Sequence, residues 1–139
     1  MKPVFADTFF FFAILNRADP LHQQAITFSR QTRLLRITTD WVITELADGL
    51  SKVGDRERFM DLHRHIQTSP AIQVVPASRA LLEEAIALYA SRPDKDWPLT
   101  DCISFVVMRD EGITQALTGD RHFEQAGFIA LLKQGARSC

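Results

Sequence analysis

Residues 4–15 read VFADTFFFFAIL, and this stretch indicates the fold class of the 139-residue chain. The apolar run at residues 4–6 has the length and composition of a short buried strand, and it ends on an acidic residue, Asp7. Thr8 is a suitable helix cap, and the apolar residues after it are expected to form a buried helix. Asp7 is therefore predicted to lie at the carboxyl end of a strand, immediately before a helix.

The same alternation of strand and helix continues along the chain. Further strands are expected at residues 34–38, 72–75 and 113–118, with a terminal candidate at 129–132. Helices are expected at residues 9–15, 20–33, 41–52, 56–67, 79–91 and 101–111. Strands that alternate with helices predict an α/β sandwich, in which helices cover both faces of a parallel sheet of four or five strands. With 46% apolar side chains, the chain is expected to form one domain, residues 1–139.

The composition excludes some classes of function. Sixteen basic and seventeen acidic residues leave a formal net charge of −1, so no strong overall positive field attracts nucleic acid. An RNA substrate would have to be held by local basic groups. The two cysteines form neither a disulfide framework nor a zinc cluster, which favours the reducing cytoplasm. The apolar stretch at residues 9–15 is far shorter than the ~20 residues that span a bilayer, so no membrane segment is expected.

Acidic residues occur where such a sheet builds its ligand site. Asp7 and Asp120 each follow a predicted strand, and Asp101 opens a predicted helix. Ligands of parallel sheets bind beyond the carboxyl ends of the strands, where the strand order reverses. If the first and fourth strands are neighbours there, these three acids face one crevice, and Glu45 would enter from the side. Taken singly, each acid could be only a helix cap, a turn residue or a solvated charge.

Crowded carboxylates predict a bound cation. Carboxylates within a few ångströms of one another repel, and the arrangement persists only with raised pKa values or with a metal ion. Oxygen ligands without clustered His or Cys favour Mg²⁺ or Mn²⁺ over zinc. Such ions bind phosphate oxygens, so the pattern predicts metal-dependent hydrolysis of phosphodiesters.

Four segments of the sequence resemble the PIN-domain family, and within it the VapC-like toxin ribonucleases. The segments are VFADTFFFFAIL, TTDWVITELADGL, DWPLTDCISFVVM and ALTGDRHFEQAGF, and together they span most of the chain. The last two are the most specific. In DWPLTDCISFVVM an acid opens an apolar helix, and in ALTGDRHFEQAGF a strand ends in Thr, which is followed by one residue and then Asp. The resemblance implies a PIN-like three-layer sandwich, a Mg²⁺ or Mn²⁺ site and cleavage of single-stranded RNA. It also implies a homodimer and, in many members, the toxin role of a toxin–antitoxin pair.

The resemblance also implies the site residues. The catalytic and metal-binding acids that it implies are Asp7, Glu45, Asp101 and Asp120. Asp120 would ligate the metal directly or through a water molecule. Thr118 is implied as a polar neighbour of the site with a substrate-binding role. Arg121 and His122 flank Asp120, and we expect them to contact a phosphate or a base of the RNA.

Two alternatives differ in class from a ribonuclease. A non-catalytic PIN-like module would bind RNA or protein without cutting, but the presence of all four acids argues against a decayed site. A small-molecule phosphohydrolase would need a second Asp two residues after Asp7, where the sequence has Phe9. For the toxin, the expected partner is a cognate antitoxin protein that blocks the acidic crevice, for example by pairing an arginine with the carboxylates.

Overall fold

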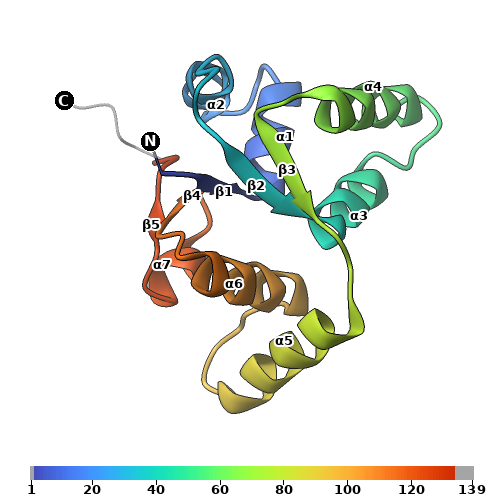
Figure 1. Ribbon diagram of the computed structural model, residues 1–139. Helices are drawn as coiled ribbons and strands as arrows, with labels where there is room; N and C mark the ends of the chain where they lie inside the picture. Colours follow the sequence, from blue (N-terminus) through green and yellow to red (C-terminus); the bar gives the residue numbers. More distant parts are fainter. Residues whose placement is uncertain (1, 134–139) are drawn as a thin grey trace.

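A five-stranded parallel sheet forms the centre of the computed structural model, which describes residues 2–133 (Figure 1). Its strands, in the spatial order β3-β2-β1-β4-β5, are β1 (Val4–Ala6), β2 (Arg36–Thr39), β3 (Ile72–Val75), β4 (Gln115–Leu117) and β5 (Ile129–Ala130). All four strand pairs are parallel. The helices are α1 (Thr8–Leu15), α2 (His22–Ser29), α3 (Asp40–Gly49), α4 (Arg56–Thr68), α5 (Arg79–Ser91), α6 (Leu99–Glu111) and α7 (Arg121–Gln125).

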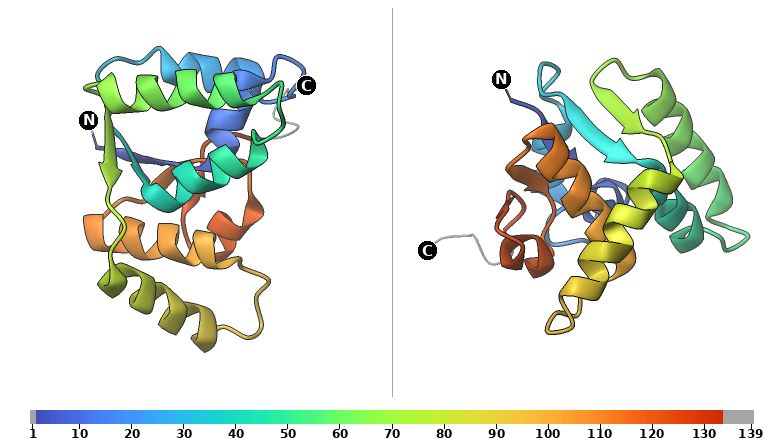
Figure 2. Two further views of the ribbon diagram at one scale, coloured as in Figure 1. Left: turned by 90° about the vertical axis from the view of Figure 1, so that its right-hand side faces the viewer. Right: turned by 60° about the horizontal axis from the view of Figure 1, so that its bottom comes forward.

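The helices form two layers around the sheet. Figures 1 and 2 show α1, α2 and α4 on one side and α6 and α7 on the other, with α5 packed on the outer side of α6. The predicted α/β sandwich is confirmed, and the terminal strand that was only a candidate is present as β5. The first three strands are added in one direction from β1, and β4 then pairs with the opposite side of β1. The strand order therefore reverses between β1 and β4. No helix within residues 2–133 is both long and apolar enough to cross a membrane.

Side-chain hydroxyls cap the first turns of two helices. The hydroxyls of Thr39 and Ser78 accept hydrogen bonds from backbone N–H groups in the first turns of α3 and α5. Gly112 ends α6 with a φ of 69°, a left-handed conformation that glycine adopts without strain. The predicted cap Thr8 is wrong, because α1 begins at Thr8 and Asp7 occupies the N-cap position.

Helix α2 is shorter than the predicted helix 20–33. The side chains of Asn16 and Asp19 accept hydrogen bonds from the backbone N–H groups two residues further on, which holds this segment in turns. At the other end, the buried guanidinium of Arg36 donates to the carbonyls of Phe28 and Gln31. These carbonyls are bound to a side chain from β2, and the helix ends at Ser29.

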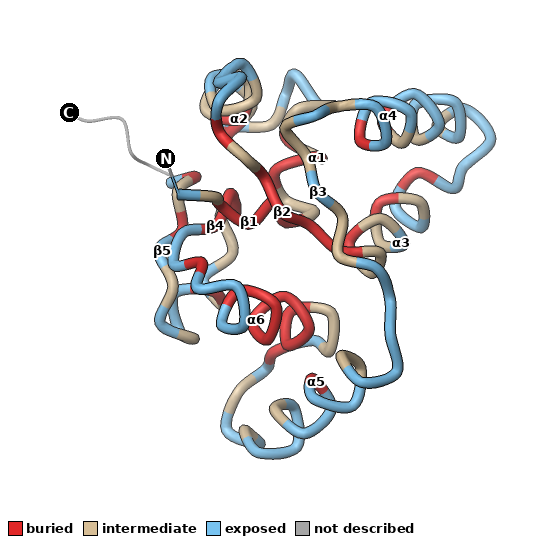
Figure 3. Tube along the Cα trace, in the orientation of Figure 1, coloured by how far each residue is buried: buried red, intermediate tan, exposed pale blue. Residues whose placement is uncertain are grey.

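The buried core joins the sheet to α6 and α7. Strands β1 and β2 are buried throughout, and α6 is buried from Asp101 to Met108, as Figure 3 shows. The ring of Phe123, on α7, lies 4.9 Å from that of Phe105 on α6 and 6.3 Å from that of Phe5 on β1, measured between centroids. This aromatic cluster fixes the position of α7 relative to the start of α6.

Replacing Phe123 with alanine is expected to destabilise the protein strongly. The ring is fully buried, and Phe-to-Ala changes in cores cost about 3 to 5 kcal/mol, because burial is lost and a cavity remains. Urea unfolding followed by circular dichroism measures the change. The control is Val53→Ala, at a residue that is 95% exposed, which should change the free energy of unfolding by less than about 0.5 kcal/mol. Similar values for the two variants would contradict the proposed anchoring role of Phe123.

Candidate active site

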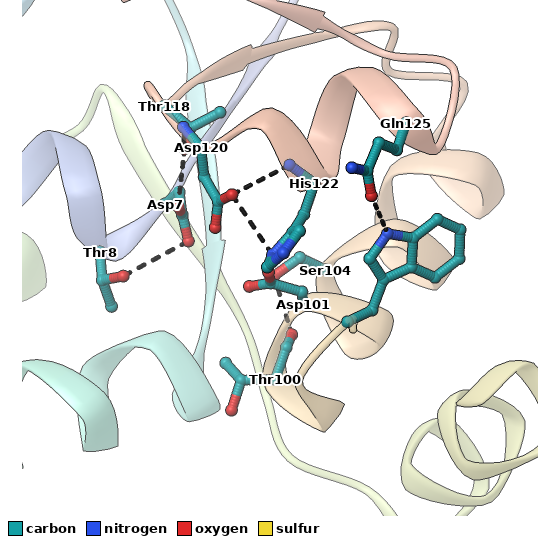
Figure 4. A network of polar contacts seen from close by, with 10 residues as sticks. Asp7, Thr8, Thr100, Asp101, Ser104, Thr118, Asp120, His122 and Gln125 are labelled. Atoms are coloured by element: carbon teal, nitrogen blue, oxygen red, sulfur yellow. Dashed lines mark hydrogen bonds and ion pairs between the residues drawn. The ribbon is translucent and has the colours of Figure 1, made fainter. Parts of the chain in front are cut away.

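Four carboxylates converge at the carboxyl ends of the central strands. Asp7 follows β1 and Asp120 follows β4, two strands that pair in register at Phe5 with Ala116. Asp101 approaches from the first turn of α6. Figure 4 shows the side chains of these three acids turned toward one another. The expectation that the first and fourth strands are neighbours is confirmed, and the predicted acids lie together for that reason.

The hydroxyl of Thr118 links the carboxylate of Asp7 to the backbone of Asp120 by hydrogen bonds. Its Oγ1 donates a hydrogen bond to Asp7 Oδ2 over 2.9 Å and accepts one from the backbone N–H of Asp120 over 3.1 Å. Thr118 is fully buried, so it has no surface with which to contact RNA. This corrects the expected substrate-binding role, because the hydroxyl positions two acids instead.

Burial and neighbouring acidic groups raise the pKa values of Asp7 and Asp101. Burial, together with the nearby charge of Asp101, raises the pKa of Asp7 from 3.8 to about 7. Burial also raises the pKa of Asp101, to about 6, although its hydrogen bond with His122 acts in the opposite direction. Because both carboxylates are buried near other acidic groups, their ionised forms lack compensating positive charge.

Glu45 enters from α3, as expected. It is partly exposed, and burial raises its pKa, while interactions with the hydroxyls of Thr8 and Thr100 lower it. The charge of Glu45 in turn raises the pKa values of both Asp7 and Asp101. Glu45 is therefore electrostatically part of the same acidic site.

The ring of His122 contacts two of the acids, and its expected contact with RNA stays a prediction. Its Nδ1 lies 3.1 Å from Asp101 Oδ2 and 3.3 Å from Asp120 Oδ1, so the ring faces the acids (Figure 4). Its backbone N–H donates to Asp120 Oδ1 over 2.9 Å, which makes Asp120 the N-cap of α7. The position of His122, two residues after a capping Asp, predicts this backbone hydrogen bond, whereas the contact of the ring with Asp101 depends on tertiary packing.

The donor set fits a divalent cation. Among residues 2–133, no Lys or Arg side chain forms an ion pair with any of the four acids. Asp101, Asp120 and His122 each offer one ligand atom, and these atoms lie within 4.8 Å of one another. Asp7 and Glu45 add carboxylates beside this group. Hard oxygen donors in excess, without a lysine or arginine to compensate them, are suited to Mg²⁺ or Mn²⁺.

Known proteins are similar to this chain in sequence and in fold. The model of the PIN domain family matches residues 4–129, a region that contains all four acids. The 23S rRNA-specific endonuclease VapC20 from two strains of Mycobacterium tuberculosis is 28% identical over 127 residues, 91% of this chain and 95% of the relative. The crystal structure of VapC20 from Mycobacterium tuberculosis, described as a sarcin–ricin loop cleaving toxin, matches with a TM-score of 0.80 and 26% identity. That match covers 91% of this chain and 96% of the other.

Replacing Asp7 with asparagine is expected to stabilise the metal-free protein at high pH. The folded-state pKa is raised, so Asp7 favours folding only while protonated, and this stability is lost as the pH rises from its unfolded value toward about 7. Asparagine mimics the protonated form and can still accept the hydrogen bond from Thr118. At about pH 8 in EDTA, the free energy of unfolding should rise by about 2 to 4 kcal/mol, and this gain should vanish near pH 4.

Chemical unfolding across this pH range measures the effect. The matched control is Asp110→Asn, at an exposed residue near the end of α6, which should give a small change with little dependence on pH. If Asp7→Asn lowers stability at about pH 8, the carboxylate of Asp7 is not held under repulsion.

Proposed function

The chain belongs to the PIN-domain family, and from this premise we propose that it is a metal-dependent endoribonuclease that hydrolyses phosphodiester bonds in single-stranded or loop RNA. The observation that carries the proposal is the convergence of four carboxylates at the carboxyl ends of the strands, three of them with raised pKa values. The endonuclease activity named for the VapC20 relatives supports it.

Each acid has a distinct place in the proposed mechanism. Asp7, Asp101 and Glu45 would hold Mg²⁺ or Mn²⁺, with Asp120 as a direct ligand or one water molecule away. A bound ion of this kind polarises the phosphoryl group and lowers the pKa of an attacking water. Thr118 keeps the Asp7 carboxylate in place by its hydrogen bond, and this restricts the geometry in which substrate and water can meet.

A groove next to Asp120 offers a path for the RNA. It has a volume of about 550 Å³ and is lined by Phe9, Gly119, Asp120, Arg121, Glu124, Ala130, Leu132 and Lys133. We propose that Arg121 and Lys133 contact phosphates there and that the partly exposed ring of Phe9 stacks on a base. Because the chain has a net charge of −1, binding of RNA would depend on positively charged side chains such as these.

The biological role that we propose is the toxin of a toxin–antitoxin pair. The description of VapC20 as a toxin supports this role. The partners would be a cognate antitoxin protein and a second copy of the chain in a homodimer, and the protein would act in the cytoplasm. The alternative, a non-catalytic PIN-like module that binds RNA or protein, is distinguished by the presence or absence of cleavage.

RNA cleavage by purified protein tests the proposed activity. With Mn²⁺ or Mg²⁺, wild type should cut at least one RNA in a panel of single-stranded and structured RNAs that includes the sarcin–ricin loop. Asp7→Asn and Asp101→Asn should each lower the rate at least ~100-fold, because each removes a charged ligand of the proposed metal site. EDTA should abolish cleavage, while Asp110→Asn should retain it. If wild type cuts nothing, or if Asp7→Asn cuts equally well, the binding module becomes the better explanation.

Arg121→Gln tests the path of the RNA. Loss of one phosphate contact should raise KM several-fold with little change in kcat, and it should reduce the salt dependence of binding by about one charge. Arg56→Gln is the matched control, since Arg56 is an exposed arginine at the start of α4, in the helix layer on the other face of the sheet. A larger effect at Arg56 than at Arg121 would place the RNA over α4.

A further inference from the structure

His122 brings a nitrogen atom to a site otherwise composed of carboxylates. We propose that His122 is itself a metal ligand, acting with Asp101 and Asp120, and that its imidazole makes the site prefer Mn²⁺ to Mg²⁺. The inference rests on the proposed function because it requires the same metal site. It extends that function by assigning a ligand and an ion preference, and it replaces the RNA contact expected for His122.

The distances around Nδ1 match the spacing of metal ligands. Neighbouring ligands of an octahedral ion with metal–ligand distances of ~2.1 to 2.2 Å lie ~3.0 to 3.1 Å apart. His122 Nδ1 lies 3.1 Å from Asp101 Oδ2 and 3.3 Å from Asp120 Oδ1, two carboxylates from different elements of the fold. In the tautomer with the ring proton on Nε2, a lone pair on Nδ1 would replace the hydrogen bond to Asp101 and meet the same ion as these two oxygens after a small adjustment.

The surrounding structure holds the ring in this orientation. His122 lies in the first turn of α7, where its own backbone N–H is bound to the carboxylate of Asp120. The next residue, Phe123, is fully buried in the aromatic cluster and anchors the helix. The side chain of His122 is only 20% exposed, whereas its neighbour Arg121 is exposed. The ring is thus directed into the acid site and is poorly placed to reach along the RNA groove.

The chemistry of imidazole gives the ion preference. Mg²⁺ binds oxygen ligands almost exclusively and gives up water reluctantly. Imidazole nitrogen favours transition ions, and for a given set of nitrogen and oxygen donors the affinity rises from Mn²⁺ onward along the first row. One nitrogen among several carboxylates should therefore lower the affinity for Mg²⁺ relative to the affinity for Mn²⁺.

Pulsed electron paramagnetic resonance of bound Mn²⁺ tests the ligation without any RNA. Modulation from a directly bound imidazole ¹⁴N is expected in wild type, absent in His122→Gln, and retained in His65→Gln, which removes an exposed histidine of α4. Modulation that persists in His122→Gln, or that is missing from Mn²⁺-loaded wild type, overturns the proposal.

Calorimetric titration with Mn²⁺ and with Mg²⁺ tests the preference. His122→Gln should weaken Mn²⁺ binding at least ~10-fold and Mg²⁺ binding less than ~3-fold. His122→Asp supplies an oxygen ligand at the same position and should reduce the ratio of Mn²⁺ to Mg²⁺ affinity while binding both ions, which also shows that the site tolerates substitution. Tighter Mn²⁺ binding by His122→Gln would mean that the ring competes with the ion and would overturn the proposal.

Metal binding by wild type distinguishes a failure of the His122 assignment from a failure of the proposed function. Wild type that binds neither ion overturns the ligand assignment and also the metal site of the proposed function. Wild type that binds Mn²⁺ through oxygen alone overturns only the role of His122, and RNA cleavage then remains a separate question.

Discussion

Repulsion between Asp7 and Asp101 is the constraint on which the site depends. Both carboxylates are buried, the charge of Asp101 raises the pKa of Asp7, and the charge of Glu45 raises the pKa of both. No lysine or arginine among residues 2–133 forms an ion pair with either acid. Folding must therefore hold together groups that would separate if the chain were free. The hydrogen bond from Thr118 compensates part of this cost for Asp7. A divalent cation would compensate the rest, and for this reason metal binding and stability are coupled in such a site.

The remainder of the fold supplies the rigidity that this repulsion requires. Asp7 follows a fully buried strand, and Asp101 lies in a helix whose next seven residues are buried. The ring of Phe123 packs between these two elements, against Phe5 on one and Phe105 on the other. Any outward movement of Asp101 would have to disturb that packing. Close-packed cores resist such displacement, so the carboxylates stay near one another even without a cation.

The sequence predicts the acids but not how their neighbours support them. Three acids lie at ends of strands and helices that hydrophobic patterning can locate, and the parallel topology then brings those ends together. The direction of the Thr118 hydroxyl is not encoded in any pattern, since a Thr after a strand can point to solvent or to the core. The contact of His122 depends on the orientation of α7, which is set by packing with α6, a helix that begins twenty-two residues earlier in the chain. Tertiary contacts of this kind do not appear in local periodicity.

A near-neutral net charge weakens general binding of RNA and so affects how an RNA-cleaving site selects its substrate. A strongly basic surface binds any RNA through counterion release, and its affinity falls steeply with salt. This chain carries a net charge of −1, and the acid site repels phosphates unless a cation is bound. Under the proposed function, RNA would be retained only where the cations of the groove and a metal-loaded site act on the same strand. Weak general binding would then favour substrates whose shape fits both, so loop geometry rather than charge would decide which RNA is cut.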